Sequence, residues 1–353
     1  MPVRQHYLTL DGLRGLVAIS VLFFHIVWQN GLGRLSPHGY LGVDFFFALS
    51  GFVIAIAYDA RLQQGMGFKQ FMIVRLRRLY PLFALGMALS AAVFALKMIP
   101  KGEFNTSEFA FASLNAFLIS PFGRVEGNDY LFPFNSPAWS LFFEIAINAV
   151  YALAAIYLTL PRLLGVLAAS AVAAIVMVTY HGSFDVGDSS SELFEGAIRV
   201  TFSFSGGVLL GRLMMAGRLR NVPTVSPVLL SVVLLAVFLF PVTQLNFIFE
   251  LVCVLLVFPL VVMWGAVREP SPRFEAVAKF SGLISYPLYI THMPVVLIST
   301  YICARLKLEG LALFAMIGAT MFIAIMLAYL AAVCFDEPIR RFFRATSSPL
   351  PTS

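Results

Sequence analysis

The sequence predicts an all-α, polytopic membrane protein, and three observations support this fold class. Of the 353 residues, 60% are hydrophobic and only 12% are charged, whereas about a quarter of the residues in soluble proteins are charged. Apolar stretches of about 20 residues, the length that crosses a bilayer as a helix, recur along the chain. The basic residues form short clusters between these stretches, so the net charge of +6 reflects membrane topology rather than nucleic-acid binding.

Ten segments are predicted to span the membrane. In chain order they cover 13–30, 41–58, 79–99, 138–160, 163–180, 196–215, 225–241, 245–266, 282–303 and 310–335. The first segment has no small-residue cleavage site before the polar stretch QNGLGRLSPHG, so we interpret it as a retained helix and not as a signal peptide. The stretch 108–120 is too short and too polar to span, and it is predicted to form an interfacial or re-entrant helix.

The distribution of basic residues predicts that both termini are cytoplasmic. Alternating the ten helices from a cytoplasmic N-terminus places 17 Lys and Arg residues inside and six outside, with Arg199 left near the outer end of its helix. Counting 108–120 as a span would reverse every later loop and place the cluster RLMMAGRLR outside. Residues 1–345 are predicted to form one membrane-embedded domain, followed by a disordered tail over 346–353.

Charged and titratable side chains inside the predicted spans are candidates for function, because such groups are costly in a bilayer. They are Arg14, His25, Asp44, Glu144, Arg199 and His292. With Arg14 at the inner interface, a helical rise of about 1.5 Å per residue puts His25 about 16 Å deeper, near the midplane. The same reasoning puts Asp44 and Glu144 in the outer half and His292 near the middle. Arg199 is the weakest candidate, because its side chain can snorkel to the outer interface.

Two imidazoles and two carboxylates at this depth suit proton transfer. A neutral His25 held by Asp44 or Glu144 could take a proton from a hydroxyl group. The alternative is that these polar groups, His292 above all, only hydrogen-bond the helices to one another.

The segment FKQFMIVRLRRLYP precedes the third predicted span. Its R-x-x-R spacing places Arg75 and Arg78 on one face of a helix, where both could bind a phosphate. A topological anchor is the alternative interpretation of such a cluster.

Two further stretches contain polar residues close to small or aromatic ones. In GVDFFFALSGF, Gly42 and Gly51 flank Ser50 and would let helices or a bound chain approach closely. In SPAWSLFFE, Trp139 is predicted at the outer interface. Ser140 is more simply explained as a residue at the start of a helix than as a nucleophile.

Taken together, these stretches resemble the acyltransferase-3 family of membrane O-acyltransferases. Six blocks occur in the family's order from residue 10 to residue 343: LDGLRGLVAISVLFFH, GVDFFFALSGFVI, RLRRLYP, PAWSLFFEI, ISYPLYITHMPV and FDEPIRRFF. Two blocks depart from the commonest pattern, with WSLFFE in place of WSLSVE and LYITH in place of LYLWH. Neither change affects a proposed catalytic residue.

The resemblance implies transfer of an acyl group, commonly acetyl, from cytoplasmic acyl-CoA to a hydroxyl of a saccharide or related acceptor. It implies a catalytic role for His25, with Arg14 as its R-x10-H partner, and a CoA-binding role for Arg75 and Arg78. Arg14, at the donor-facing end of its helix, is also predicted to bind acyl-CoA. Asp44 and Glu144 match recurrent family positions and are predicted to assist catalysis. Positions predicted to contact the substrate are Ser50, Trp139, Ser140 and His292.

The same resemblance implies a bacterial inner-membrane protein that uses acyl-CoA, commonly acetyl-CoA, as a co-substrate without a tightly bound cofactor or metal. The acceptor would be a glycan, a lipid-linked sugar or a glycoside, and both direct transfer and a covalent intermediate fit. A proton-coupled transporter is the alternative, because intramembrane His, Asp and Glu also build proton relays. The absence of a second copy of the R-x10-H stretch disfavours it.

Overall fold

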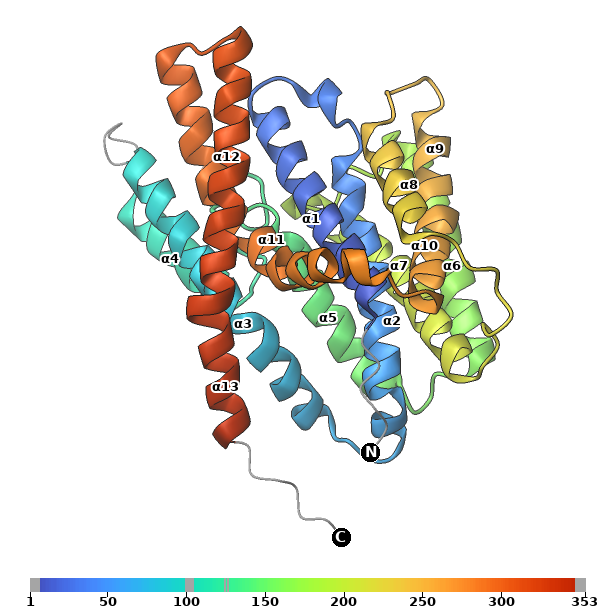
Figure 1. Ribbon diagram of the computed structural model, residues 1–353. Helices are drawn as coiled ribbons and strands as arrows, with labels where there is room; N and C mark the ends of the chain where they lie inside the picture. The colour runs from blue at the N-terminus through green and yellow to red at the C-terminus, as the bar shows by residue number, and fades with distance from the viewer. Residues whose placement is uncertain (1–6, 99–104, 124, 126, 347–353) are drawn as a thin grey trace.

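The computed structural model describes residues 7–98, 105–123, 125 and 127–346, and these fold into helices joined by short loops (Figure 1). The helices are α1 (Leu8–Gln29), α2 (Gly42–Gln63), α3 (Phe68–Met98), α4 (Thr106–Phe117), α5 (Ala138–Ala154), α6 (Leu160–His181), α7 (Leu193–Met215), α8 (Pro227–Leu239), α9 (Asn246–Val252), α10 (Phe258–Val267), α11 (Pro272–Leu306), α12 (Gly310–Leu330) and α13 (Glu337–Thr346). Two π-helical turns, η5 (Cys253–Val257) and η6 (Ala331–Asp336), join α9 to α10 and α12 to α13. Within these residues, β-pairing is limited to isolated bridges.

The ten predicted spans correspond to ten apolar helical segments. Eight helices in the described part of the chain are long and apolar enough to cross a membrane, and two shorter apolar helices cover Ala138–Ala154 and Pro227–Leu239. The stretch predicted as interfacial or re-entrant forms α4, which is 12 residues long and is not a candidate span. The fold class of an all-α polytopic membrane protein is therefore confirmed.

Two helices begin well before their predicted spans. Helix α3 starts at Phe68 rather than at 79, and α11 starts at Pro272 rather than at 282. Hydropathy falls where charged residues begin, but charged residues continue a helix when they pair along it. Lys279 donates to Glu275 one turn earlier at 2.6 Å, for example. A charged segment thus precedes the apolar part of each helix, and in α11 it is stabilised by this pair.

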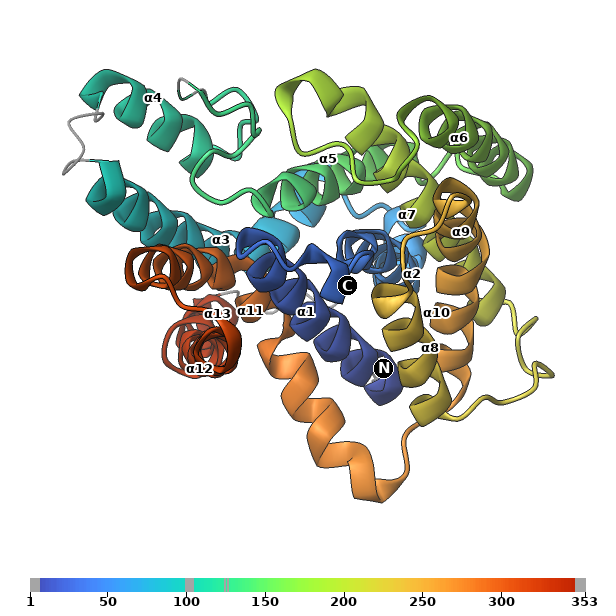
Figure 2. The ribbon, with the colours of Figure 1, turned by 90° about the horizontal axis from the view of Figure 1, so that it is seen from above.

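Helix α1 lies near the centre of the bundle. Seen from above, it runs between α11 on one side and α8 on the other, with α2 behind it (Figure 2). Helices α12 and α13 stack end to end at one edge of the molecule, and α6 lies at the opposite edge (Figures 1 and 2). Residues on α1 can therefore contact several helices that are distant in sequence.

Small residues allow the closest helix contacts. A methyl group at Gly207 of α7 would overlap the backbone of Ala48 in α2, and one at Gly51 of α2 would overlap the carbonyl of Phe204 in α7. Such close approach through small residues is a common way for helices to associate in membranes. The prediction that Gly51 permits close packing is confirmed.

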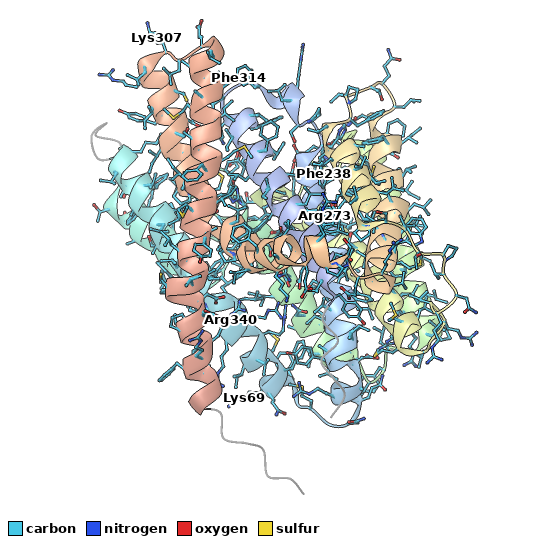
Figure 3. All side chains as sticks on the ribbon, viewed as in Figure 1. Lys69, Phe238, Arg273, Lys307, Phe314 and Arg340 are labelled. Atoms are coloured by element: carbon cyan, nitrogen blue, oxygen red, sulfur yellow. The ribbon has the colours of Figure 1, made fainter. Side chains whose placement is uncertain are left out.

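The loops alternate between the two ends of the bundle. Lys307 lies at one end of the molecule, whereas Lys69 and Arg340 lie toward the other (Figure 3). This arrangement agrees with the predicted grouping of these three residues into one outer and two inner positions. The predicted tail over 346–353 lies outside the described residues from 347 onward.

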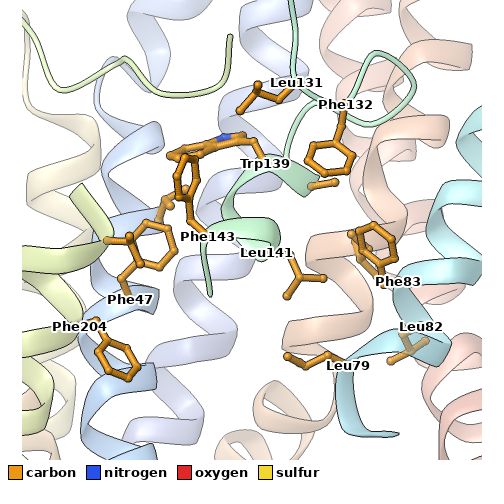
Figure 4. Close-up of a cluster of buried hydrophobic side chains, with 14 of the residues drawn as sticks. Phe47, Leu79, Leu82, Phe83, Leu131, Phe132, Trp139, Leu141, Phe143 and Phe204 are labelled. Atoms are coloured by element: carbon orange, nitrogen blue, oxygen red, sulfur yellow. The ribbon is translucent and has the colours of Figure 1, made fainter. Parts of the chain in front are cut away.

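A cluster of buried aromatic side chains holds the start of α5 in the interior (Figure 4). Trp139 is only 7% exposed, and its ring lies 6.3 Å from that of Phe47 and 5.8 Å from that of Phe143. The depth of Trp139 at the outer interface stays a prediction, and the structure adds that its ring packs against other helices instead of facing outward. These apolar contacts fix the first turns of α5 against α2.

Candidate active site

Two histidines from different helices lie side by side. The ring centroids of His25 on α1 and His292 on α11 are 5.1 Å apart, with 31° between the ring planes. His292 is 1% exposed, its Nδ1 lies 3.0 Å from the carbonyl oxygen of Leu288, and its Nε2 is buried without a hydrogen-bond partner in the described structure. Because a carbonyl can only accept, Nδ1 carries the proton and Nε2 keeps a free lone pair. His25 and His292, both predicted from the sequence as candidate site residues, are thus neighbours.

Two prolines and an asparagine shape α11 around His292. Pro294 has no backbone N–H, so it leaves the carbonyl of Ile290 without its usual partner one turn earlier. Asn135 donates from Nδ2 to that carbonyl at 2.9 Å. Gly86 of α3 faces the same carbonyl and has no side chain to obstruct it. The Ile290 carbonyl thus accepts a hydrogen bond from Asn135, although the usual helical hydrogen bond from residue 294 is missing.

A cavity of about 150 Å³ lies one helical turn from the histidine pair. Gln29, one turn after His25, and Met293, which follows His292, are both part of its wall. Lys97, Asn128 and Tyr130 supply further polar groups, and Phe94 and Phe134 supply aromatic faces. The cavity combines hydrogen-bonding groups with aromatic rings, as a small polar ligand requires.

Asp44 pairs with an arginine. Arg199 Nη2 donates to Asp44 Oδ2 at 2.6 Å, and both side chains are almost completely buried. Arg199 also donates to the carbonyl of Val186 at 2.7 Å, and its guanidinium lies 5.1 Å from the ring centroid of Trp139. Arg199, the weakest candidate because its side chain could have snorkelled to the interface, instead pairs inside the bundle with a fully buried carboxylate.

Glu144 pairs with Arg75. Arg75 Nη2 and Ser50 Oγ both donate to Glu144 Oε1, at 3.0 and 2.8 Å. This contact contradicts the predicted depths, which placed Arg75 at the inner face and Glu144 in the outer half. The difference arises because α3 begins two turns before Arg75 and α5 begins within the interior.

The predicted contact between His25 and a carboxylate is also wrong. Both Asp44 and Glu144 are engaged by arginines, and among the described residues the ring neighbour of His25 on another helix is His292. An arginine offers a carboxylate charge compensation and several donors, which a neutral imidazole does not. His25 therefore lies beside a second imidazole and keeps its nitrogens free of carboxylate partners.

Four arginines gather around the end of α1 that is distant from His25. Arg14 donates to Ser285 Oγ and to the Gly282 carbonyl, each at 2.7 Å. Electrostatic interactions link Arg78 to Arg14, Arg75 and Arg340. The predicted donor-binding arginines therefore lie together, and Arg340 joins them from α13.

The Ser140 hydroxyl forms hydrogen bonds to other groups of the protein. Its Oγ lies 3.0 Å from the Pro137 carbonyl and 2.6 Å from the hydroxyl of Tyr289. The first contact is typical of a residue in the first turn of a helix. The ring of Tyr289 in turn lies 6.2 Å from that of His292, so Ser140 is connected to the histidine pair through one side chain.

Sequence reasoning missed a second buried polar cluster. Glu250 of α9 is fully buried and accepts from the backbone N–H of Phe184 at 2.5 Å and from Tyr40 and Asn246. His38 lies 3.8 Å from the same carboxylate. Glu250 falls inside the predicted span 245–266, so the rule that selected Glu144 would also have selected it. Among the described residues, no group of three or more His, Cys, Asp or Glu side chains could hold a metal ion.

The bundle of membrane-spanning helices, the central histidine pair and the arginine cluster define an integral membrane protein with a buried polar site. The sequence matches the family described as "Acyltransferase domain" (Acyl_transf_3) over residues 7–333. The chain belongs to this acyltransferase-3 family and is an acyltransferase. This membership excludes the transporter considered above as the protein's class.

Several curated proteins are similar to parts of the chain. "Protein 2 in picA locus" of Rhizobium radiobacter is 40% identical over 186 residues, which cover 49% of this chain and 94% of that protein. The peptidoglycan O-acetyltransferase OatA of Listeria monocytogenes is 38% identical over 82 residues, 22% of this chain and 12% of OatA. The putative membrane-bound transacylase BcsY of Komagataeibacter xylinus is 29% identical over 157 residues, 43% of this chain and 38% of BcsY. No solved structure matches the chain.

Proposed function

We propose that the protein transfers an acyl group, acetyl in the first instance, from cytoplasmic acyl-CoA to a hydroxyl of a saccharide or related acceptor. The observation that carries this proposal is the layout of α1. One end of the helix holds Arg14 within a cluster of arginines, and His25 lies about 16 Å further along, one helical turn before Gln29 in the wall of a cavity. The phosphates of CoA would bind the arginines while the pantetheine arm reaches toward His25.

His25 acts as the general base in this proposal. Its free imidazole nitrogen takes the proton of the acceptor hydroxyl as the oxygen attacks the thioester carbon. The carbon–sulfur bond then breaks, and the CoA thiolate takes up the proton. His292 is a positioning residue, because its Nδ1–H is fixed on the Leu288 carbonyl and its Nε2 can accept an N–H from the neighbouring ring. The same base serves direct transfer or a step through a covalent intermediate.

The acceptor is proposed to be a glycan, a lipid-linked sugar or a glycoside. Relatives named as peptidoglycan O-acetyltransferases support a saccharide, and the cavity beside the histidines offers both polar groups and aromatic rings. Aromatic faces and hydrogen-bonding groups together suit the apolar and polar sides of a sugar ring. The location that accords with this function is the inner membrane of a bacterium.

Comparing the glycans and lipids of cells with and without the gene tests this proposal. We expect mass spectrometry to show one component that loses a single acyl increment, 42 mass units for acetyl, when the gene is deleted. Re-expression should restore it. Identical glycan and lipid profiles in the two strains would contradict the proposal.

Both termini are proposed to be cytoplasmic, which places the arginine cluster on the side where acyl-CoA is found. Single cysteines at Asp188 and Arg218, in a background that lacks the native cysteines, test this orientation. A membrane-impermeant maleimide should label position 188 in intact spheroplasts and position 218 only after the membrane is permeabilised. The reverse pattern would invert the topology.

A further inference from the structure

Arg340 of α13 lies in the arginine cluster without being part of the R-x-x-R motif. It pairs with Asp336 at 2.7 Å, and electrostatic interactions link it to Arg14 and Arg78. The Nε atoms of both Arg340 and Arg75 are buried without a hydrogen-bond partner in the described structure. Buried N–H donors without a hydrogen-bond partner are costly, so a site with two of them is suited to an anionic ligand.

The next residue, Arg341, shows what an ordinary ion pair on this helix looks like. Arg340 and Asp336 have the same i, i+4 spacing as Arg341 and Glu337. The side chains of Arg341 and Glu337 are 74% and 49% exposed, whereas those of Arg340 and Asp336 are 34% and 8% exposed. An exposed ion pair such as Arg341–Glu337 stabilises a helix only slightly. Helix stability therefore does not explain why the Arg340–Asp336 pair is more buried. Burial of the other pair against α3 therefore points to a different role.

The π-helical turn η6 accounts for the position of Arg340. Helices α12 and α13 form one continuous helical run through η6, a wider π-helical turn that ends at Asp336. Such turns change the direction in which the following side chains point, and they occur often at functional sites. Arg77 of α3 lies 5.2 Å from the ring centroid of Phe343, so α13 packs on the helix that carries Arg75 and Arg78.

We propose that Arg340 binds a phosphate group of the acyl-CoA donor, with Asp336 as its positioning residue. This inference rests on the proposed function. CoA carries a diphosphate and a separate 3′-phosphate, and guanidinium groups bind phosphates through paired N–H donors. Arg75 already donates to Glu144, so part of its guanidinium group is engaged within the protein. Arg340 extends the site from α13, and Arg14, which donates to Ser285 of α11, extends it from α1.

Equilibrium binding of acetyl-CoA to the full-length protein in neutral detergent tests this proposal. We expect Arg340→Gln to weaken binding about tenfold to a hundredfold, and Arg341→Gln, the matched control, to change it less than twofold. Arg340→Lys keeps a positive charge without the paired donors, so its affinity should be intermediate. Acetyl-dephospho-CoA, which lacks the 3′-phosphate, identifies whether this phosphate is the one bound: in that case Arg340→Gln changes its affinity little.

Three results would overturn the proposal. Wild-type affinity in Arg340→Gln, with Arg75→Ala/Arg78→Ala weakened, would reject the role of Arg340 and leave the proposed function intact. An absence of acetyl-CoA binding by the wild-type protein would reject both. An Arg340→Gln defect seen only in vesicles of anionic phospholipid would identify a lipid headgroup as the ligand of Arg340. Unfolding temperatures measured on each variant show whether it is folded, and Asp336→Asn provides a second variant if Arg340→Gln is not.

Discussion

Replacing His25 with alanine is expected to reduce acyl transfer by about 10²- to 10⁴-fold, the usual contribution of a general base. The ring of His25 lies beside His292 and one turn from the cavity that would hold the acceptor. Its loss removes the group that takes the hydroxyl proton, while the helix around it stays apolar. The measurement is transfer of radiolabelled acetyl from acetyl-CoA in membranes that contain equal amounts of each variant.

His181→Ala is the matched control, because His181 lies at the end of α6 and contacts Glu195 at 3.1 Å, in neither the histidine pair nor the arginine cluster. It should retain wild-type turnover. His292→Gln keeps a polar side chain but removes the neighbouring imidazole, so it should lower turnover less than His25→Ala and leave acetyl-CoA affinity unchanged. Near-normal turnover of His25→Ala would disprove the assignment of the base.

Replacing Asp44 with alanine is expected to destabilise the protein by about 3–5 kcal/mol, because it leaves the buried charge of Arg199 without a partner. Asp44 is fully buried and accepts from Arg199 through both carboxylate oxygens. Arg199 in turn binds the loop at Val186 and lies against Trp139, so the loss should loosen the contact between α2, α7 and the start of α5. Unfolding in detergent, followed by temperature or denaturant, measures the effect.

The double variant Asp44→Ala/Arg199→Met distinguishes a structural role of Asp44 from a catalytic one. It removes the unpaired charge together with its partner, so it should recover most of the lost stability. If Asp44 acts only through this ion pair, turnover should recover with stability. A double variant that is stable but inactive would instead support the catalytic role that the sequence predicts for Asp44.

Much of the fold could be predicted because each membrane-spanning helix appears in the sequence as a long apolar stretch. Each of the ten predicted spans corresponds to an apolar helix, and 108–120 was recognised as too short to be one. The ends of α3 and α11 were misplaced, because hydropathy reports where a helix leaves the apolar core and not where its hydrogen bonds stop.

The sequence predicted several of the residues that the structure brings together, but not their pairings. Arg14, Arg75 and Arg78 do gather at one place, and His25 and His292 do meet. The partner of Asp44 is 155 residues away in sequence, and pattern spacing carries no information about which arginine reaches a given carboxylate. Depth along separate helices could not resolve this either, because it assumed that every segment starts at a membrane surface, whereas α5 starts inside the bundle.

Helix α11 has a consequence for the distance over which the acyl group must travel. Its Ser285 contacts Arg14 in the arginine cluster, and its His292, seven residues later, contacts His25. The two contacts are thus about 10 Å apart along the axis of α11 and about 16 Å apart along the axis of α1, the long Arg14 side chain making up the difference. This separation is set by covalent geometry and by packing within the protein, not by the lipid. Thickening or thinning the surrounding bilayer would tilt the bundle or deform the membrane, but it would not stretch the gap between donor and base.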